Sequence, residues 1–426
     1  MSHPQKVPVN TPEMLLQAPS ATSVTKLFST AALTKMAFEG QNLIPLQTKL
    51  FIESLQNPAS VTALISLSII EQLKGNQDVG LEYQSAALSQ CQLYKTPTDS
   101  ETKLRLLVLA APIHMGGNTP IEFLLEDSDV EITTLYVLPG VGLPDPLPEH
   151  DLAFVAAPGD SDHSRAFLLD IEEKTQNWPI RLLNDPGMIA QLERDTLCQK
   201  LSTVDNLIAP TTVFCDRPTL EKIGRREIDV DAILPEGNWP IVVRPVGSHA
   251  GRHLDKLTDP EQIAPYLEVC SDPGFFLTRF IDYRSNDGWF RKYRIVFING
   301  RAFACHMAIS DEWKIWYKDA DMIESDSKRS EEERFMVRFD ETFGNRHIET
   351  FQDLTNQVGL EYFGIDCAET RDGKLIVFEA DNALIIHDMD PKDIFPYKSP
   401  QMRKIFKAFE NTLLDMADRE SADKNR

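Results

Sequence analysis

Short apolar runs that alternate with helical patterns begin near Lys103, and they constrain the fold more than any other feature of the chain. Each run ends at Pro, Gly or Asp, and helical patterns at 120–126 and 163–176 lie between some of them. Buried strands alternating with helices predict a small parallel α/β sheet. The loop 111–118 after the first run could bind a ligand, but it lacks GxGxxG, so we expect no dinucleotide site. The four runs are Arg105–Ala110, Ile132–Leu138, Leu152–Ala156 and Ile180–Leu183.

The stretch before this sheet is predicted to be helical over about 22–95, with apolar residues at spacings of three and four. Ala63, Leu67, Gly75, Gly80 and Ala87 lie where one unit of a tetratricopeptide-type repeat carries small and large residues, and the stretch resembles one such unit. An ordinary helical hairpin remains the alternative. A single unit rarely stands alone, so it must pack on the rest of the chain or on a partner.

Charge and cysteine content exclude several classes of protein. The net charge is −22, with 65 acidic against 43 basic residues, which disfavours nucleic acid and anionic membranes as partners. The longest apolar stretch, 62–70, is far short of the ~20 residues that cross a bilayer. The N-terminus has no apolar signal segment. Six scattered cysteines indicate reduced thiols rather than disulfides or a zinc site, so we expect a cytoplasmic protein.

From residue 184 onward the pattern becomes α+β, with two predicted hairpins. The run Tyr293–Ile298 is joined to Arg301–Ile309 by Asn299-Gly300, a strong turn signal. The second hairpin pairs 364–370 with 374–380 around the turn Arg371–Gly373. Two further strands, 240–245 and 275–281, precede them.

A cation at the end of a predicted strand is followed by a loop of small residues. Arg244 ends the strand 240–245, and the loop contains Gly247, Ser248 and Gly251. Two glycines and a serine allow backbone N–H groups to close on phosphate oxygens, as in an anion nest. The pattern is compatible with a phosphate loop and also with an ordinary surface loop.

Two acids lie inside apolar strands of the second hairpin. Asp366 and Glu379 are thirteen residues apart, and paired strands would bring them within reach of one another. Buried acids need a cation, and Mg²⁺ takes oxygen ligands. The alternative is an exposed strand face that happens to carry acids. For an empty site we expect that replacing either acid by its amide leaves the fold intact and relieves repulsion. Arg294, at the start of the preceding strand, could face a phosphate or belong to a solvated cluster.

The order and spacing of these features resemble the carboxylate ligases of the ATP-grasp superfamily. The resemblance covers roughly residues 104–410 and is strongest to the glutathione-synthetase and RimK-like branch. Asn184-Asp185-Pro186 followed by Arg194-Asp195 resembles the start of that branch's ATP-grasp region. The resemblance implies an ATP-grasp fold, mixed α/β and α+β, preceded by a small Rossmann-like domain and an N-terminal all-α segment. The implied divisions are a disordered tail at 1–21, helices at 22–95, the α/β domain at 103–184, ATP-grasp subdomains at 185–274 and 275–414, and a disordered tail at 415–426.

The resemblance also implies roles for individual residues. Arg244 stands where the family has its second ATP-binding lysine, and Arg294 where an arginine faces the transferred phosphate. Departures are Thr196 in place of the first ATP lysine, Arg244 in place of lysine, and Asp381 in place of a metal-binding Asn. The implied catalytic residues are Arg294 and Arg244; the ATP-binding residues are Arg244, Gly247, Ser248, Gly251, Phe276, Thr278, Arg279, Phe280 and Ile281; the metal ligands are Asp366, Glu379 and Asp381.

The implied function is an ATP-dependent ligase. It would activate a carboxylate as an acyl phosphate and couple it to an amine of an amino acid, peptide or small molecule, releasing ADP and phosphate. ATP and Mg²⁺, or Mn²⁺, would be its cofactors. A degenerate nucleotide-binding module that recruits a partner, and a small-molecule kinase, remain alternatives. A protein partner at the N-terminal helices and a homodimer are also open.

Several side chains have no assigned role. His249, His253, His306 and His387 could form a metal site but are more often structural or in contact with substrate. Trp313, Trp316 and Tyr317 could line an acceptor pocket or pack a lid.

Overall fold

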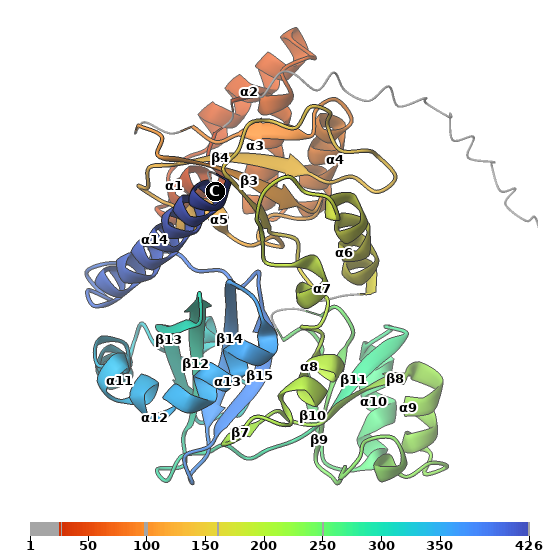
Figure 1. Ribbon diagram of the computed structural model, residues 1–426. Helices are drawn as coiled ribbons and strands as arrows, with labels where there is room; N and C mark the ends of the chain where they lie inside the picture. The colour runs from red at the N-terminus through yellow and green to blue at the C-terminus, as the bar shows by residue number, and fades with distance from the viewer. Residues whose placement is uncertain (1–24, 27, 98–100, 160–161, 249–250, 425–426) are drawn as a thin grey trace, which may run out of the picture.

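The computed structural model describes residues 25–26, 28–97, 101–159, 162–248 and 251–424. It has a mixed α/β architecture, as the sequence predicts, and its strands form three sheets (Figure 1). The expected tail at 1–21 lies outside the described residues. In the described part of the chain, no helix is both long and apolar enough to cross a membrane.

The first sheet has six strands in the order β1-β2-β4-β3-β5-β6. Its centre is parallel, β4-β3-β5-β6, and these are the four predicted apolar runs. Every residue of β5 is buried, as expected for a strand covered on both faces. The strands are β1 (Thr25–Lys26), β2 (Leu93–Lys95), β3 (Leu104–Ala110), β4 (Val130–Tyr136), β5 (Leu152–Val155) and β6 (Leu182–Leu183), with helices α5 (Ile121–Leu124) and α6 (Asp162–Thr175) between them.

The N-terminal segment is mainly helical but not all-α, which corrects the prediction. Its two short strands β1 and β2 extend the first sheet, and β2 pairs antiparallel with β4. Tyr94 of β2 is fully buried and meets Tyr136 of β4 edge to face, with ring centroids 5.9 Å apart. The helical core therefore continues into the sheet. The helices are α1 (Thr30–Phe38), α2 (Ile44–Gln56), α3 (Val61–Leu73) and α4 (Gln77–Leu88).

The second sheet is antiparallel, with strand order β10-β9-β11-β8 and a hydrophobic core of its own. The predicted division at 274/275 is wrong in detail, because the strand that begins at Gly274 pairs with β8 and β9 of this sheet. The elements are β8 (Thr212–Asp216), α9 (Arg217–Gly224), β9 (Ile241–Pro245), β10 (Asp255–Leu257), α10 (Ile263–Val269) and β11 (Gly274–Arg279), with short 3-10 turns η1 (Val230–Ala232) and η2 (Pro260–Gln262).

The third sheet has the order β13-β12-β14-β15-β7, and both predicted hairpins are confirmed in it. Asn299 and Gly300 both have positive φ, 47° and 81°, which suits a two-residue hairpin turn. The strands are β7 (Leu207–Ile208), β12 (Phe290–Ile298), β13 (Arg301–Ser310), β14 (Tyr362–Glu369) and β15 (Leu375–Asp381). The surrounding helices are α7 (Pro186–Ile189), α8 (Arg194–Leu201), α11 (Asp326–Val337), α12 (Phe343–Arg346) and α13 (Ile348–Val358), with turns η3 (Tyr317–Asp319) and η4 (Phe339–Glu341).

The chain ends in a long helix, α14 (Lys398–Lys424). The expected disordered tail from 415 is therefore wrong as far as Lys424. Leu413 and Met416 are buried against the main core. This tertiary packing stabilises the helix even though the sequence around it is mostly polar. Figure 1 shows α14 beside α5 of the first sheet, and α14 also packs on β12 and β13 of the third sheet.

Candidate functional site

Three charged residues form a row across neighbouring strands of the third sheet. Arg294 of β12 pairs in register with Asp366 of β14, which pairs with Glu379 of β15. The register shifts beside this row on both sides, between Arg294 and Ile295 and between Asp366 and Cys367. Such bulges re-aim side chains and often lie next to functional sites.

Asp366 is held by two cations from β12. Arg294 donates from Nε (2.8 Å) and Nη2 (3.1 Å), and Lys292 Nζ lies 2.8 Å from Asp366 Oδ2. Lys292 and Arg294 are two positions apart on the strand, so both side chains project to the same face. Burial acts to raise the pKa of Asp366, which is only 2% exposed, but the two cations outweigh it and hold that pKa well below its usual range. Burial acts to lower the pKa of Arg294, and Asp366 raises it on balance, so both groups stay charged.

Glu379 is held by two arginines from other parts of the chain. Arg194 of α8 donates from Nη2 to Glu379 Oε2, and Arg244 Nη1 of β9 lies 3.9 Å from the same oxygen. Arg194 was not predicted as a site residue. It stands two positions before Thr196, and only the packing of α8 against β15 brings its guanidinium to the row.

These residues line a cavity of about 610 Å³ between the second and third sheets. Its lining carries six Lys or Arg side chains against three acids, in a protein whose net charge is −22. The predicted residues that line it are Arg244, Gly251, Thr278, Arg279, Phe280, Ile281, Arg294, Asp366 and Glu379. Four predicted residues that the structure also describes do not line it: Gly247, Ser248, Phe276 and Asp381.

The predicted glycine loop is organised by Arg244 in the described part. Arg244 donates from Nε to Ser248 Oγ (3.3 Å) and from Nη2 to the Ser248 carbonyl, and Ser248 is buried. Gly247 and Gly251 have positive φ, 64° and 70°, which glycine adopts without strain. His249, within this loop, lies outside the described residues. Phe276 is buried in the sheet as the cross-strand neighbour of Arg244.

Two of the three predicted metal ligands lie together. Asp366 and Glu379 are cross-strand partners on the cavity wall, whereas Asp381 Oδ1 accepts a hydrogen bond from the amide of Ala383 (2.7 Å). Within the described ranges, no group of three or more His, Cys, Asp or Glu side chains could hold a metal ion. Mg²⁺ is usually bound by one or two carboxylates together with substrate phosphates. Asp366 and Glu379 fit a Mg²⁺ of that kind, whose remaining ligands would come from a bound phosphate.

The histidines do not form a metal site among the described residues, which leaves the alternative that they are structural or contact a substrate. His253 is beside a different surface hollow, and its carbonyl accepts from the Tyr266 hydroxyl at 2.9 Å. His306, the cross-strand partner of Arg294, and His387 line a second cavity. Burial lowers the pKa of His306 well below its usual value, and the nearby charges of Arg294 and Lys398 lower it further, so its imidazole is neutral at pH 7.

The second cavity, of about 830 Å³, adjoins the first, since Arg294 and Trp316 line both. Of these two cavities, Trp313 lines the first and Tyr317 the second. Lining a cavity is compatible with both alternatives, an acceptor pocket and a packed lid. The arrangement brings a cationic cavity and a larger apolar one together at Arg294.

No protein-family model matches the chain, and no curated protein matches it. Several solved structures are similar to the chain. A RimK domain ATP-grasp protein from Sphaerobacter thermophilus is 14% identical with a TM-score of 0.42, covering 74% of this chain and 99% of that chain. The VanG D-Ala:D-Ser ligase from Enterococcus faecalis is 13% identical with a TM-score of 0.43, covering 75% and 100%. The ATP-grasp ligase PsnB, bound to a precursor peptide and AMPPNP, is 13% identical with a TM-score of 0.38, covering 74% and 100%. These are similarities of fold.

Proposed function

We propose that the chain is an ATP-dependent ligase of the ATP-grasp kind, which activates a carboxylate as an acyl phosphate and couples it to an amine. The observation that carries the proposal is the row of Arg294, Asp366 and Glu379 on the wall of the cationic cavity. A polyphosphate is the natural partner of a cavity with excess positive charge in an otherwise acidic protein.

ATP would lie along the cationic cavity. Its adenine would meet the strand end Thr278–Ile281, where Phe280 packs edge to face on Trp313 with centroids 5.7 Å apart. Its phosphates would lie toward Arg244 and Arg294. Asp366 and Glu379 would hold Mg²⁺, which supplies charge neutralisation between the phosphates when bound. The ion pairs that now engage both acids would loosen as phosphates take over the cations.

The reaction needs positioning and charge neutralisation more than a nucleophilic side chain. A carboxylate oxygen attacks the γ-phosphorus, the bond from that phosphorus to the ADP oxygen breaks, and an acyl phosphate forms. An amine nitrogen then attacks the acyl carbon, the bond to the phosphate oxygen breaks, and the amine loses a proton. Arg294 lines both cavities, so it can face the transferred phosphoryl group from one side and the carboxylate from the other.

A second candidate is a nucleotide-binding module without turnover. It is favoured by the four cations that already engage Asp366 and Glu379, together with Thr196 in place of a lysine. Such a module would bind ATP and release no ADP.

The test is ADP formation from Mg-ATP with pools of carboxylates, using hydroxylamine as a general amine so that acyl phosphates are trapped as hydroxamates. The ligase proposal expects carboxylate-dependent ADP release and a hydroxamate of matching mass. Glu379→Gln should lower this rate at least about 100-fold, because it removes one negative charge from a site for Mg²⁺. Asp381→Asn is the matched control, since Asp381 lies outside the cavity lining and should be tolerated. ATP binding without any carboxylate-dependent ADP release would favour the second candidate.

A further inference from the structure

The 830 Å³ cavity has walls from three parts of the chain that are far apart in sequence. Helices α1 and α3 of the N-terminal segment contribute Phe38, Ile65 and Ile69. The first sheet and its 113–123 loop form a second wall, and the segments 305–324 and 385–402 around the third sheet form the rest. Pockets of this size hold drug-sized ligands. The N-terminal segment is therefore part of the cavity and packs on the rest of the chain, one of the two possibilities that its sequence leaves open.

Large apolar side chains are left exposed around this cavity. Phe38 (52% exposed), Trp316 (46%), Ile323 (56%) and Ile385 (46%) all line it. They come from three separate segments, so no local pattern of one helix explains their exposure. Exposed apolar surface that gathers around a cavity marks a ligand site, because a ligand removes that surface from water.

Polar contacts fix the N-terminal helices in place around the cavity. Gln72 of α3 accepts from the Met115 amide (2.7 Å), and Gln84 of α4 donates to the Ile113 carbonyl (2.9 Å). Glu122 is half-buried and accepts from the Ser29 hydroxyl (2.8 Å) at the start of α1. These side chains are used in holding the wall together, so the N-terminal contribution to the ligand is mainly apolar.

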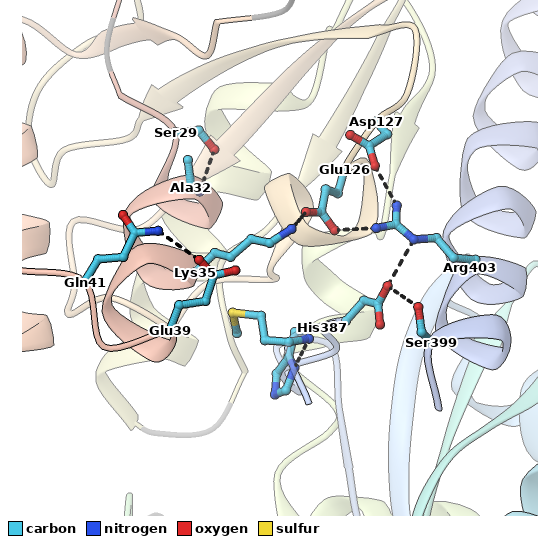
Figure 2. Close-up of polar contacts among 12 residues, drawn as sticks. Ser29, Ala32, Lys35, Glu39, Gln41, Glu126, Asp127, His387, Ser399 and Arg403 are labelled. Carbon is cyan, nitrogen blue, oxygen red and sulfur yellow. Dashed lines mark hydrogen bonds and ion pairs between the residues drawn. The ribbon is translucent and has the colours of Figure 1, made fainter. Parts of the chain in front are cut away.

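Figure 2 shows a second set of contacts that ties the same wall to the end of the chain. Glu126 lies between Lys35 of α1 (3.2 Å) and Arg403 of α14 (3.1 Å), and Arg403 Nε also reaches Asp388 (3.1 Å). His387, which precedes Asp388, lines the cavity, and its ring centroid is 6.2 Å from that of Phe38. The N-terminal wall thus has a defined position relative to the third sheet.

The charged end of the cavity is at Arg294. Its ion pair with Asp366 uses Nε and Nη2, and a guanidinium has five N–H donors, so N–H groups remain for a ligand. Lys398 also lines the cavity, but its charge is balanced by Asp390 (3.2 Å) and Glu332 (3.6 Å). Glu122 is engaged at α1. Lys318, the third cation of the lining, is exposed, and its Nζ lies 5.5 Å from the centroid of the Trp316 ring. The cation best placed for a ligand's charged group is therefore Arg294, which also lines the cationic cavity.

We propose that this cavity binds a carboxylic acid with an extended apolar body, and that helices α1 and α3 select it by its length. The carboxylate lies at Arg294 and the apolar body reaches toward Phe38 and Ile69. The identity of the reacting group rests on the proposed function, since that reaction needs a carboxylate beside the γ-phosphate. The preference for an apolar body rests on the cavity alone.

The test measures binding without nucleotide, so it does not depend on turnover. Acetate, hexanoate and decanoate are titrated calorimetrically into the full-length protein, below the concentrations at which they form micelles, with decylamine as the cationic counterpart. Affinity should rise roughly fourfold per added methylene. Decanoate should bind more tightly than decylamine.

Matched variants locate the site. Phe38→Ala should weaken decanoate binding about tenfold, as expected for loss of half a buried phenyl ring. Phe51→Ala is its control, since Phe51 of α2 is similarly exposed (45%) and lies outside the cavity lining. Ile323→Ala and Ile348→Ala form a second pair, with side chains 56% and 60% exposed, of which only Ile323 lines the cavity. All four residues are partly exposed, so folding should survive.

The outcomes separate this inference from the ligase proposal. No rise of affinity with chain length, equal losses in lining and control variants, or tighter binding of decylamine would overturn the inference. Hydroxamate formed from acetate but not from decanoate would overturn it while leaving the ligase standing. Decanoate bound as expected, with no detectable binding of Mg-ATP, would support the apolar site and remove the ligase.

Discussion

Replacing Asp366 by asparagine should destabilise the protein even without a nucleotide. The sequence alone predicts the opposite sign, because two neighbouring acids in an empty site repel each other. The structure shows Asp366 buried against Arg294 and Lys292, and the charge of Glu379 is engaged by Arg194 and Arg244. The neutral amide would leave two cations facing a side chain without charge.

The size of the effect follows from burial. Removing one partner of a buried ion pair costs about 3–5 kcal/mol, and since the asparagine oxygen can still accept one hydrogen bond, we expect about 3 kcal/mol for Asp366→Asn. Glu379 is 27% exposed, so Glu379→Gln should cost about 1 kcal/mol or less. With each kcal/mol lowering Tm by about 2–4 °C in domains of 150–250 residues, Asp366→Asn should lower Tm by roughly 6–12 °C.

The assay is urea and thermal unfolding of the apo protein, with Glu379→Gln as the comparison. Lys292→Met provides a double-mutant cycle: in its background Asp366→Asn should cost less, by about 1 kcal/mol, because one stranded cation is gone. The shift should change little between low and high salt, since a buried pair is weakly screened. An unchanged or raised Tm for Asp366→Asn would show that acid repulsion dominates and that this ion-pair argument is wrong.

Three further predictions concern nucleotide binding, His306 and the N-terminal segment. Mg-ATP at 100 times its Kd should stabilise the protein by about 2.7 kcal/mol, seen as a raised Tm, and no shift at millimolar ATP would contradict both candidate functions. His306→Gln should reduce the sensitivity of the protein to acid. The pKa of His306 is lower in the folded state than its unfolded value near 6.5, so the folded form loses up to about 1.4 kcal/mol of stability per pH unit below that value. The free energy of unfolding, measured at pH 7.5 and 5.5, should therefore fall more in the wild type than in the variant. A chain that starts at residue 103 should aggregate on expression, because it lacks β1, β2 and the helices that bury Tyr136 and Leu138. Size-exclusion chromatography tests this: a soluble monomer would show that the N-terminal segment is a separate unit.

Local sequence patterns determined most of the elements. Apolar runs bounded by Pro and Gly predicted the parallel strands, and Asn299-Gly300 and Arg371–Gly373 predicted the two hairpins with their strands correctly paired. The cross-strand pairing of Asp366 with Glu379 followed from hairpin geometry, since a short turn sets the register of the two strands. These features depend on residues close in sequence.

The partners of those acids were decided only by the tertiary structure. Arg194 reaches Glu379 from a helix 185 positions earlier in the chain. The sequence pattern marks Arg194 only as part of the start of the ATP-grasp-like region, and nothing local pairs it with Glu379. The same holds for the cavity wall from α1 and α3, whose apolar residues look in sequence like the core of a helical hairpin. Sequence periodicity shows which face of an element is buried, but what lies against that face depends on long-range packing. Charge balance and cavity shape depend on such contacts, and they therefore needed the folded chain.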